Sequence, residues 1–421
     1  MKGMKETKFE DTEIGRIPEE WEEFPLSSLV TDIADGPFGS NLKTEHYISK
    51  KQVRVVQLSN IGDDGWHDAN TKYTSFAHAS TLSRCIIPTG SVLIAKMMPA
   101  GRAIICPNID NSYILGSDVV RITCNTKLEP KYFVYSTKSK LYLEQISECT
   151  QGSTRQRTSI SKLKNIQIVV PPFQEQCRIA SALTSIDNLI SSLGKLIEKK
   201  KNIKQGVIQQ LLTGKTRLKG FDEPWMEHTI DELFDLGNGY TPSKSNPAYW
   251  TNGTIPWFRM EDIRTNGRIL KDSIQHVTPE AVKGNGLYPK YSIILSTTAT
   301  IGEHALLIAD SLANQQFTFL LRKVNRRDMI DIIFFYHYCF ILGKWCRDNI
   351  NAGGLLAVNM DDLKNHSIYI PKSIAEQQAI ATILTKMDDE ITALEVKKAK
   401  YEAIKQGMMQ QLLTGKIRLI S

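Results

Sequence analysis

Four short stretches carry residue types at spacings that approach known chemistry. Residues 213–216 (TGKT) resemble the end of a phosphate-binding loop, and residues 170–173 (VPPF) resemble the Pro-Pro-aromatic motif of amino-methyltransferases. Residues 234–239 echo a cofactor-binding glycine loop, and residues 395–397 (EVK) echo the carboxylate–lysine pair of nucleases. Each is incomplete, because Gln209 stands where the phosphate loop needs glycine, Val170 cannot accept a hydrogen bond from an amine, and the glycines are one residue too far apart. The fourth stretch falls in a helical pattern whose charges usually face solvent.

Histidines and cysteines add no catalytic or metal-binding pattern. The eight histidines are scattered, and the seven cysteines include no C-x-x-C pair. The sequence therefore predicts no catalytic residue, no metal site and no disulfide framework. We expect a non-catalytic protein that needs no cofactor of its own.

Length and composition favour a globular chain of several domains. The chain has 421 residues, 41% of them hydrophobic, and a net charge of +7, which permits an anionic partner without proving one. The longest apolar stretch, residues 330–342, is too short and polar to span a bilayer. No secretory signal is visible at the N-terminus, so we expect a cytoplasmic location without membrane contact.

The chain is a tandem repeat of about 200 residues. Residues 203–218 (IKQGVIQQLLTGKTRL) and 404–419 (IKQGMMQQLLTGKIRL) differ at three positions. Fainter matches continue upstream, such as Trp21 with Trp225 and residues 92–101 with 293–302. Each copy is thus a variable globular part followed by a nearly invariant tail, so the tails should do one job twice and the globular parts related but different jobs.

The tails carry a heptad pattern of apolar residues. Steps of four and three predict two helices of about 40 residues, roughly 60 Å long, that bury their stripes against each other in an antiparallel coiled coil. The residues expected to pair the helices are Ile179, Leu183, Ile186, Ile190, Leu193, Ile197, Gly206, Leu211, Ile380, Leu384, Met387, Ile391, Leu394, Gly407 and Leu412.

Two mid-helix glycines suggest a close approach of the facing helix. Glycine in a helix interior destabilises the helix by about 1 kcal/mol relative to alanine. Yet each tail has a glycine at the same position, Gly206 in the first and Gly407 in the second. A register with Gly206 opposite Met387 would also bring Lys204 to Asp388 and Lys405 to Asp187.

The globular parts contain short β-rich runs punctuated by glycine and proline. Examples are residues 53–61, 91–97 and 118–124 in the first and 254–263, 291–297 and 317–324 in the second. An aromatic helix is expected near the end of each, at 132–146 and 330–348, and a last strand at 163–170 and 363–370. The fold class is therefore α+β, in two pseudo-repeated globular domains separated by two long antiparallel coiled-coil helices.

In combination, these features resemble the specificity subunit of Type I restriction–modification systems. The resemblance lies in the duplicated E-Q…Q-x-L-L-T-G-K tails, each preceded by proline, and in residues 254–263 and 296–317. It implies target recognition domains at 1–171 and 219–370, and conserved long helices at 172–218 and 371–421. Each domain would read half of a bipartite asymmetric site on double-stranded DNA, and the helices would fix the spacing and dock two methyltransferase subunits. Restriction subunits would join them, and the partners, not this chain, would use S-adenosylmethionine, ATP and magnesium.

Polar and basic loop residues are the candidates for DNA contact. They are Lys43, Lys96, Arg102, Arg155 and Arg157 in the first domain, and Arg259, Arg264, Thr297, Thr298 and Thr300 in the second. Two other functions stay open: a self-sufficient DNA methyltransferase or nuclease, and a protein-only coiled-coil scaffold.

Overall fold

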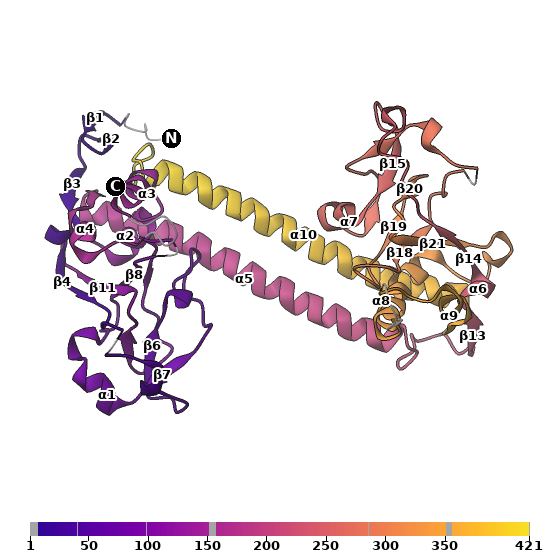
Figure 1. Cartoon of the computed structure of the whole chain (residues 1–421), viewed down its shortest axis with the longest axis horizontal. Coiled ribbons are helices and arrows are strands. Elements are labelled where there is room, and N and C mark those ends of the chain that lie inside the picture. The colour runs from indigo at the N-terminus through magenta and orange to yellow at the C-terminus, as the bar shows by residue number, and fades with distance from the viewer. Residues whose placement is uncertain are drawn as a thin grey trace. The chain divides into compact units, whose positions relative to one another are not determined.

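The computed structural model describes residues 7–39, 41–97, 99–150, 157–284, 286–350 and 356–420. Contacts between Cα atoms divide the chain into two compact units. Unit 1 comprises Met1–Gly194 and Val396–Ser421, and unit 2 comprises Lys195–Glu395. Each unit therefore holds one globular part and portions of both long helices, α5 (Phe173–Leu211) and α10 (Ile374–Leu412) (Figure 1).

Unit 1 contains twelve of the described strands and four short helices besides the long ones. The strands are β1 (Phe9–Thr12), β2 (Gly15–Pro18), β3 (Glu22–Pro25), β4 (Val30–Asp35), β5 (Tyr47–Ile48), β6 (Val53–Val56), β7 (Lys72–Thr74), β8 (Val92–Ala95), β9 (Ala103–Ile105), β10 (Tyr113–Leu115), β11 (Val119–Cys124) and β12 (Gln167–Val170), and the helices are α1 (Phe76–Thr81), α2 (Pro130–Ser136), α3 (Lys140–Cys149) and α4 (Ile160–Asn165).

Two four-stranded sheets form the body of unit 1. Their strand orders are β4-β11-β8-β9 and β10-β6-β7-β5, and a separate pair, β12-β3, leads into α5. The strands β6 and β8 are buried at every position, as the continuous apolar runs in their sequences require. Trp21, Phe133 and Leu183 belong to one apolar core, so the globular part and the first half of α5 pack as one body.

Unit 2 repeats this plan with ten of the described strands. They are β13 (Trp225–Thr229), β14 (Phe234–Asn238), β15 (Ile255–Phe258), β16 (Ile269–Leu270), β17 (His276–Val277), β18 (Ile293–Ser296), β19 (His304–Leu307), β20 (Leu312–Ala313), β21 (Phe317–Arg322) and β22 (Ser367–Pro371), with helices α6 (Ile230–Leu233), α7 (Met260–Asn266), α8 (Ile332–Asp348) and α9 (Met360–Asn365). The main sheet has the order β14-β21-β18-β19-β16, and α8 covers it over β18 and β19.

Three details of the predicted elements are wrong. The aromatic helix of the first copy is split into α2 and α3, because Ser139 caps a new helix by accepting a hydrogen bond from the Tyr142 amide. Residues 163–165 and 363–365 end short helices and the last strands begin only at Gln167 and Ser367. The run 254–263 is a strand that passes into α7.

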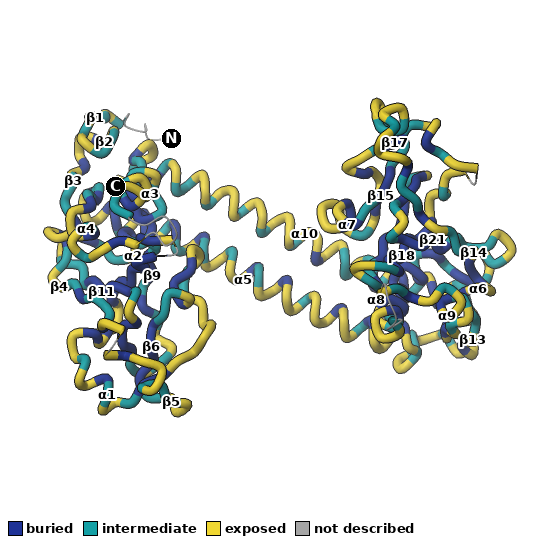
Figure 2. Tube along the Cα trace, viewed as in Figure 1, coloured by how far each residue is buried: buried dark blue, intermediate teal, exposed yellow. Residues whose placement is uncertain are grey.

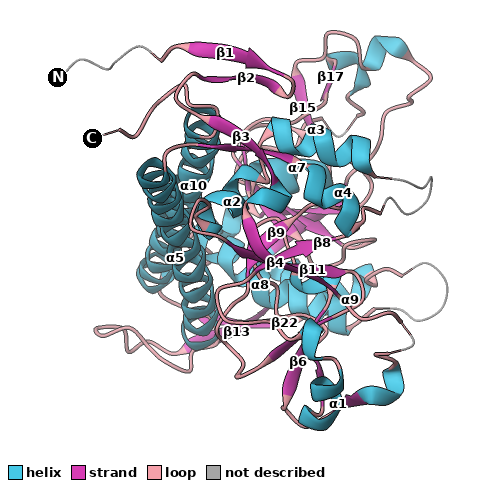
Figure 3. Cartoon of the chain, turned by 90° about the vertical axis from the view of Figure 1, so that its left-hand side faces the viewer, coloured by secondary structure: helices cyan, strands magenta, loops and turns pink. Residues whose placement is uncertain are grey.

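The long helices run antiparallel within each unit and bury the heptad seam. Lys405 of α10 pairs with Asp187 of α5 at 2.5 Å in unit 1, and Lys204 of α5 pairs with Asp388 of α10 in unit 2. Both pairs confirm the predicted register. Figure 2 shows the buried positions recurring along each helix between exposed ones, and Figure 3 shows α5 and α10 side by side. The buried seam residues are Ile179, Leu183, Ile186, Leu193, Ile197, Leu211, Ile380, Leu384, Ile391 and Leu412, with Ile190, Met387 and Leu394 half-buried.

The predicted close approach at the two glycines is wrong. Gly206 and Gly407 are exposed and lie off the seam, and a Cβ added at either would meet no described atom within 4 Å. Neither glycine therefore pairs the helices. The physical reason is positional: the seam passes through Lys204 and Val207 in α5, and Gly206 points outward between them.

Candidate functional site

In unit 1, a buried carboxylate joins the globular part to both long helices. Glu175, in the first turn of α5, has a side chain that is 2% exposed. It accepts hydrogen bonds from the Trp21 indole at 3.2 Å and from the Arg418 guanidinium at 2.8 Å on each oxygen. Arg418 follows α10, so this cluster fixes the end of one helix against the start of the other.

Unit 2 repeats the cluster with equivalent residues. Glu376 is fully buried and accepts two hydrogen bonds from Arg217, at 2.6 and 2.7 Å, and one from Trp225 at 3.5 Å. The neighbouring glutamines, Gln176 and Gln377, are also fully buried and bind backbone groups of their own globular parts at 2.8–2.9 Å. The invariant Glu-Gln and Arg of the two tails are therefore structural connectors.

Further along the helices, each unit carries a polar cluster that contacts the globular part. In unit 2, His337 lies 3.9 Å from Asp388 and hydrogen-bonds the Thr385 hydroxyl at 3.0 Å. Burial, with the nearby Lys204 ammonium, lowers the pKa of His337 to about 3, so the ring is neutral. In unit 1, Tyr135 takes the place of the histidine and donates to Asp187 at 2.7 Å.

The loops that follow β8 and β18 carry several of the predicted DNA-contact residues. In unit 1, the Thr158 amide donates to the Lys96 carbonyl, and the Lys96 amide donates to the Asp118 carbonyl. Arg157 pairs with the Asp118 carboxylate at 2.8 Å. In unit 2, the Val358 amide donates to the Thr297 carbonyl at 2.9 Å. The structure thus brings residues 157–158 and 357–358 to the equivalent loop of each domain.

At two positions the structure does not support the predicted DNA contact. Lys96 is 4% exposed and paired with Asp35, and Thr297 is 5% exposed and bonded to the Thr318 hydroxyl at 2.9 Å. Arg155 lies outside the described residues. DNA contact stays a prediction for the others, which are half-buried or exposed: Lys43, Arg102, Arg157, Arg259, Arg264, Thr298 and Thr300.

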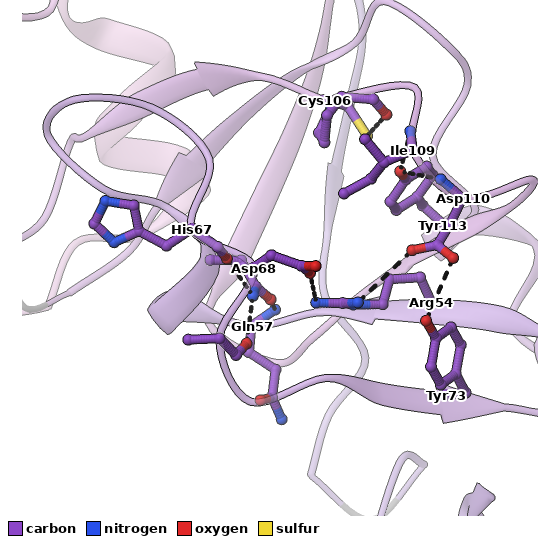
Figure 4. A network of polar contacts seen from close by, with 12 residues as sticks. Arg54, Gln57, His67, Asp68, Tyr73, Cys106, Ile109, Asp110 and Tyr113 are labelled. Carbon is purple, nitrogen blue, oxygen red and sulfur yellow. Dashed lines mark hydrogen bonds and ion pairs between the residues drawn. The ribbon is translucent and has the colours of Figure 1, made fainter. Parts of the chain in front are cut away.

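A buried arginine shapes the surface of unit 1 (Figure 4). Arg54 of β6 is 2% exposed at its side chain and pairs with Asp68 at 2.7 Å and Asp110 at 3.7 Å. Its guanidinium also lies 5.6 Å from the ring centres of Trp66 and Tyr73. This network holds the segment between β6 and β7, which the sequence analysis did not single out. A buried cation is visible in structure only, since its sequence context is an ordinary strand.

Two neighbouring hollows mark the surface of unit 2. A groove of about 1060 Å³ lies between α7, α8 and the two long helices, and Arg264 lines it. A second hollow of about 540 Å³ is lined by Thr300, Glu303 and Ile350. Arg347 of α8 lines both. Thus two predicted DNA-contact residues, Arg264 and Thr300, lie in adjoining hollows joined by an arginine that the sequence analysis missed.

Cysteine reactivity and metal binding can each be assessed from the described residues. Burial raises the pKa of Cys106, Cys124 and Cys346 to about 12, so these thiols are poor nucleophiles. No group of three histidine, cysteine or acidic side chains in the described part of the chain could hold a metal ion. Glu395, of the nuclease-like pair, is bound to Lys201 at 2.6 Å. No helix among the described residues has the length and apolar character needed to cross a membrane.

Residues 18–205 and 222–406 both match the family described as the Type I restriction modification DNA specificity domain. The chain belongs to this family. The specificity subunit of the Escherichia coli type I enzyme EcoprrI is 47% identical over 175 residues, which cover 40% of this chain and 43% of that subunit. The putative MjaX specificity subunit of Methanocaldococcus jannaschii is 25% identical over 441 residues, covering 99% of this chain and 98% of that one.

Solved structures agree with the fold. The S subunit of a type I restriction–modification system from M. genitalium matches with a TM-score of 0.60 at 17% identity, covering 93% of this chain and 96% of that one. A chain from a structural study of assembly and conformational transition of the type I system matches with a TM-score of 0.59 at 17% identity, covering 95% and 99%. The α+β fold with two specificity domains and two long helices is therefore that of the family.

Proposed function

We propose that this chain is the DNA sequence-recognition subunit of a Type I restriction–modification complex. Each specificity domain reads one half of a bipartite, asymmetric site on double-stranded DNA. The observation that carries the proposal is the duplication itself: the connectors Glu175–Arg418 and Glu376–Arg217 are equivalent, whereas the domain surfaces differ. Two different specificity domains, held by equivalent connectors, are suited to recognising an asymmetric DNA sequence.

The two domains are built differently beneath their surfaces at one pair of matching strands. Arg54 organises unit 1 around an arginine–aspartate network, while at the matching strand of unit 2 Trp257 packs at a right angle against Trp250, 5.0 Å between ring centres. Base edges in the major groove are distinguished by donor and acceptor patterns, so unlike surfaces select unlike half-sites.

The long helices set the distance between the two half-sites. Each has 39 residues, or about 60 Å at 1.5 Å per residue. Two half-sites read from the same side of a duplex are separated by whole helical turns, each about 34 Å long. A stiff pair of helices about 60 Å long is long enough to span one such turn. The outer faces of the same helices dock two methyltransferase subunits, and restriction subunits complete the assembly.

The chemistry belongs to the partners. Methyltransferase subunits use S-adenosylmethionine and flip the target adenine out of the helix, and restriction subunits use ATP and magnesium. The purified chain incubated with duplex DNA and labelled S-adenosylmethionine should transfer no methyl group, and addition of its methyltransferase partner should start the reaction. Methyl transfer by the chain alone would contradict the proposal and favour a self-sufficient enzyme.

A further inference from the structure

The groove between unit 2's specificity domain and the long helices is strongly basic. Six lysines and arginines line it, and they outnumber its three acidic residues: Lys201, Lys204, Arg264, Arg268, Lys344 and Arg347 against Asp388, Asp389 and Glu395. Two of those acids are already neutralised, Asp388 by Lys204 and Glu395 by Lys201. The groove therefore attracts an anionic partner.

Three of the cations are available to such a partner. Arg264, Lys344 and Arg347 are exposed, and in the part of the chain that the structure describes they form no ion pair. Arg347 makes one long hydrogen bond, 3.5 Å to the Ile301 carbonyl, which leaves most of its donors free. Arg268, by contrast, is bound to Glu303 at 2.5 Å and supports the wall of the groove.

The position of Arg347 favours the DNA backbone as the anionic partner. Its side chain lines both the basic groove and the hollow that contains Thr300, so the cations continue into the loop that follows β18. A duplex whose bases meet that loop carries phosphates at regular intervals beside it. An acidic protein segment would satisfy the charge but has no reason to follow the loop.

The equivalent place in unit 1 is lined by different residues. The corresponding corner holds a pocket of about 200 Å³, lined by Asp64, Trp66 and Lys138. At the offset of 202 residues that relates Ile61 to Ile263, Gly62 and Trp66 stand where unit 2 has Arg264 and Arg268. Two cations of the groove, Arg264 and Arg268, thus have no basic counterpart in unit 1.

We propose that Arg264, Lys344 and Arg347 bind the phosphate backbone of the DNA beside the half-site read by unit 2. This rests on the proposed function and deepens it, because it assigns to unit 2 a sequence-independent contribution to affinity. Contacts to phosphates position the protein and carry no sequence information.

The test compares two triple variants of the assembled complex with its methyltransferase partner. One is R264Q/K344Q/R347Q. The matched control, K219Q/K290Q/K372Q, removes three exposed lysines of unit 2 that lie outside the groove. Fluorescence anisotropy gives the affinity for duplexes with and without the recognised sequence over a series of salt concentrations.

Each lost phosphate contact reduces the magnitude of the slope of log affinity against log salt concentration by about 0.9. The slope of the groove variant should therefore be smaller in magnitude by about 2 to 3 on both duplexes. Its methylated sequence should stay the same, and the control should keep the wild-type slope. Equal slopes in both variants, a loss confined to the specific duplex, or a loss of partner assembly would overturn the proposal. The proposed function fails separately, if the wild-type complex prefers no duplex sequence.

Discussion

Arg418 donates hydrogen bonds to both carboxylate oxygens of Glu175, a residue 243 positions earlier in the chain. The Arg418 side chain is 8% exposed and that of Glu175 2%, so neither charge is well solvated without the other. The end of α10 is thereby fastened to the start of α5, and the first specificity domain is complete only when the second tail has folded onto it. The equivalent pair, Arg217 with Glu376, closes unit 2.

Removing Arg418 should destabilise unit 1 strongly. The R418A variant leaves the Glu175 carboxylate buried and uncompensated, at a cost of about 3 kcal/mol. R217A should lower the free energy of unfolding by less, because Arg217 is 30% exposed and water can more easily reach the Glu376 carboxylate once the arginine is removed. K416A, an exposed neighbour, serves as the control. Thermal unfolding monitored in each variant checks this order, and an R418A melting temperature equal to that of K416A would contradict it.

Swapping charges across the helices tests the register. K204D and D388K should each lower the free energy of unfolding by about 2 kcal/mol, less than for a fully buried pair because Asp388 is 35% exposed. The double variant should regain much of that loss. The same swap at Lys200 and Glu390, which are 32% and 51% exposed, should change stability by less than about 1 kcal/mol. Denaturant titration of the double variant decides the matter: no recovery would show that these residues do not interact.

Alanine substitution should stabilise the protein at the two mid-helix glycines and destabilise it at a glycine in the globular part of unit 2. G206A and G407A should each stabilise the chain by about 1 kcal/mol, because the added methyl group meets no described atom and the helix loses a flexible residue. G343A should destabilise it, since a Cβ there would lie 2.2 Å from the Gly302 carbonyl. Melting temperatures measured together would refute this if G206A and G343A shifted in the same direction.

Unit 2 should lose stability when the pH falls below about 6.5. Burial lowers the pKa of His304 and His337 to about 3, whereas both rings titrate near 6.5 when unfolded. The unfolded state therefore binds protons first, and stability is fully present above pH 6.5 and declines as the pH falls toward 3. At pH 5 each ring costs about 2 kcal/mol.

The variant H337Q isolates one of these two contributions. It should lose about 2 kcal/mol less than the wild type between pH 7 and pH 5, as measured by urea unfolding at the two values. Identical pH dependence in wild type and H337Q would mean that His337 is not held neutral.

The helices were predictable because their evidence is local and repeated. A heptad seam and charges recurring at an offset of 201 residues fix both the pairing and the register, and Lys204 with Asp388 follows from them. The connectors were not predicted, although their residues are identical in both copies. Which arginine meets which glutamate depends on how the tails return to the helix starts, and that is set by tertiary packing.

Surface residues were the hardest to predict, because polarity was taken as a sign of exposure. Lys96 and Thr297 follow buried strands and are themselves buried and bonded within the domain. Lys344 and Arg347 are exposed, but they belong to a helix whose many aromatic residues indicated a core position. Arg54 illustrates the same limit, since a cation inside a strand becomes a structural residue only when Asp68 and Asp110 converge on it from other segments.

The central claim is that each specificity domain reads its own half of one split DNA site. Replacing residues 1–171 with the corresponding domain of another family member, followed by methylation mapping of genomic DNA from cells that also carry the partner subunits, tests it most directly. The account predicts that one half of the methylated sequence changes while the other half and the spacing stay the same. A change in both halves, or in neither, would contradict it.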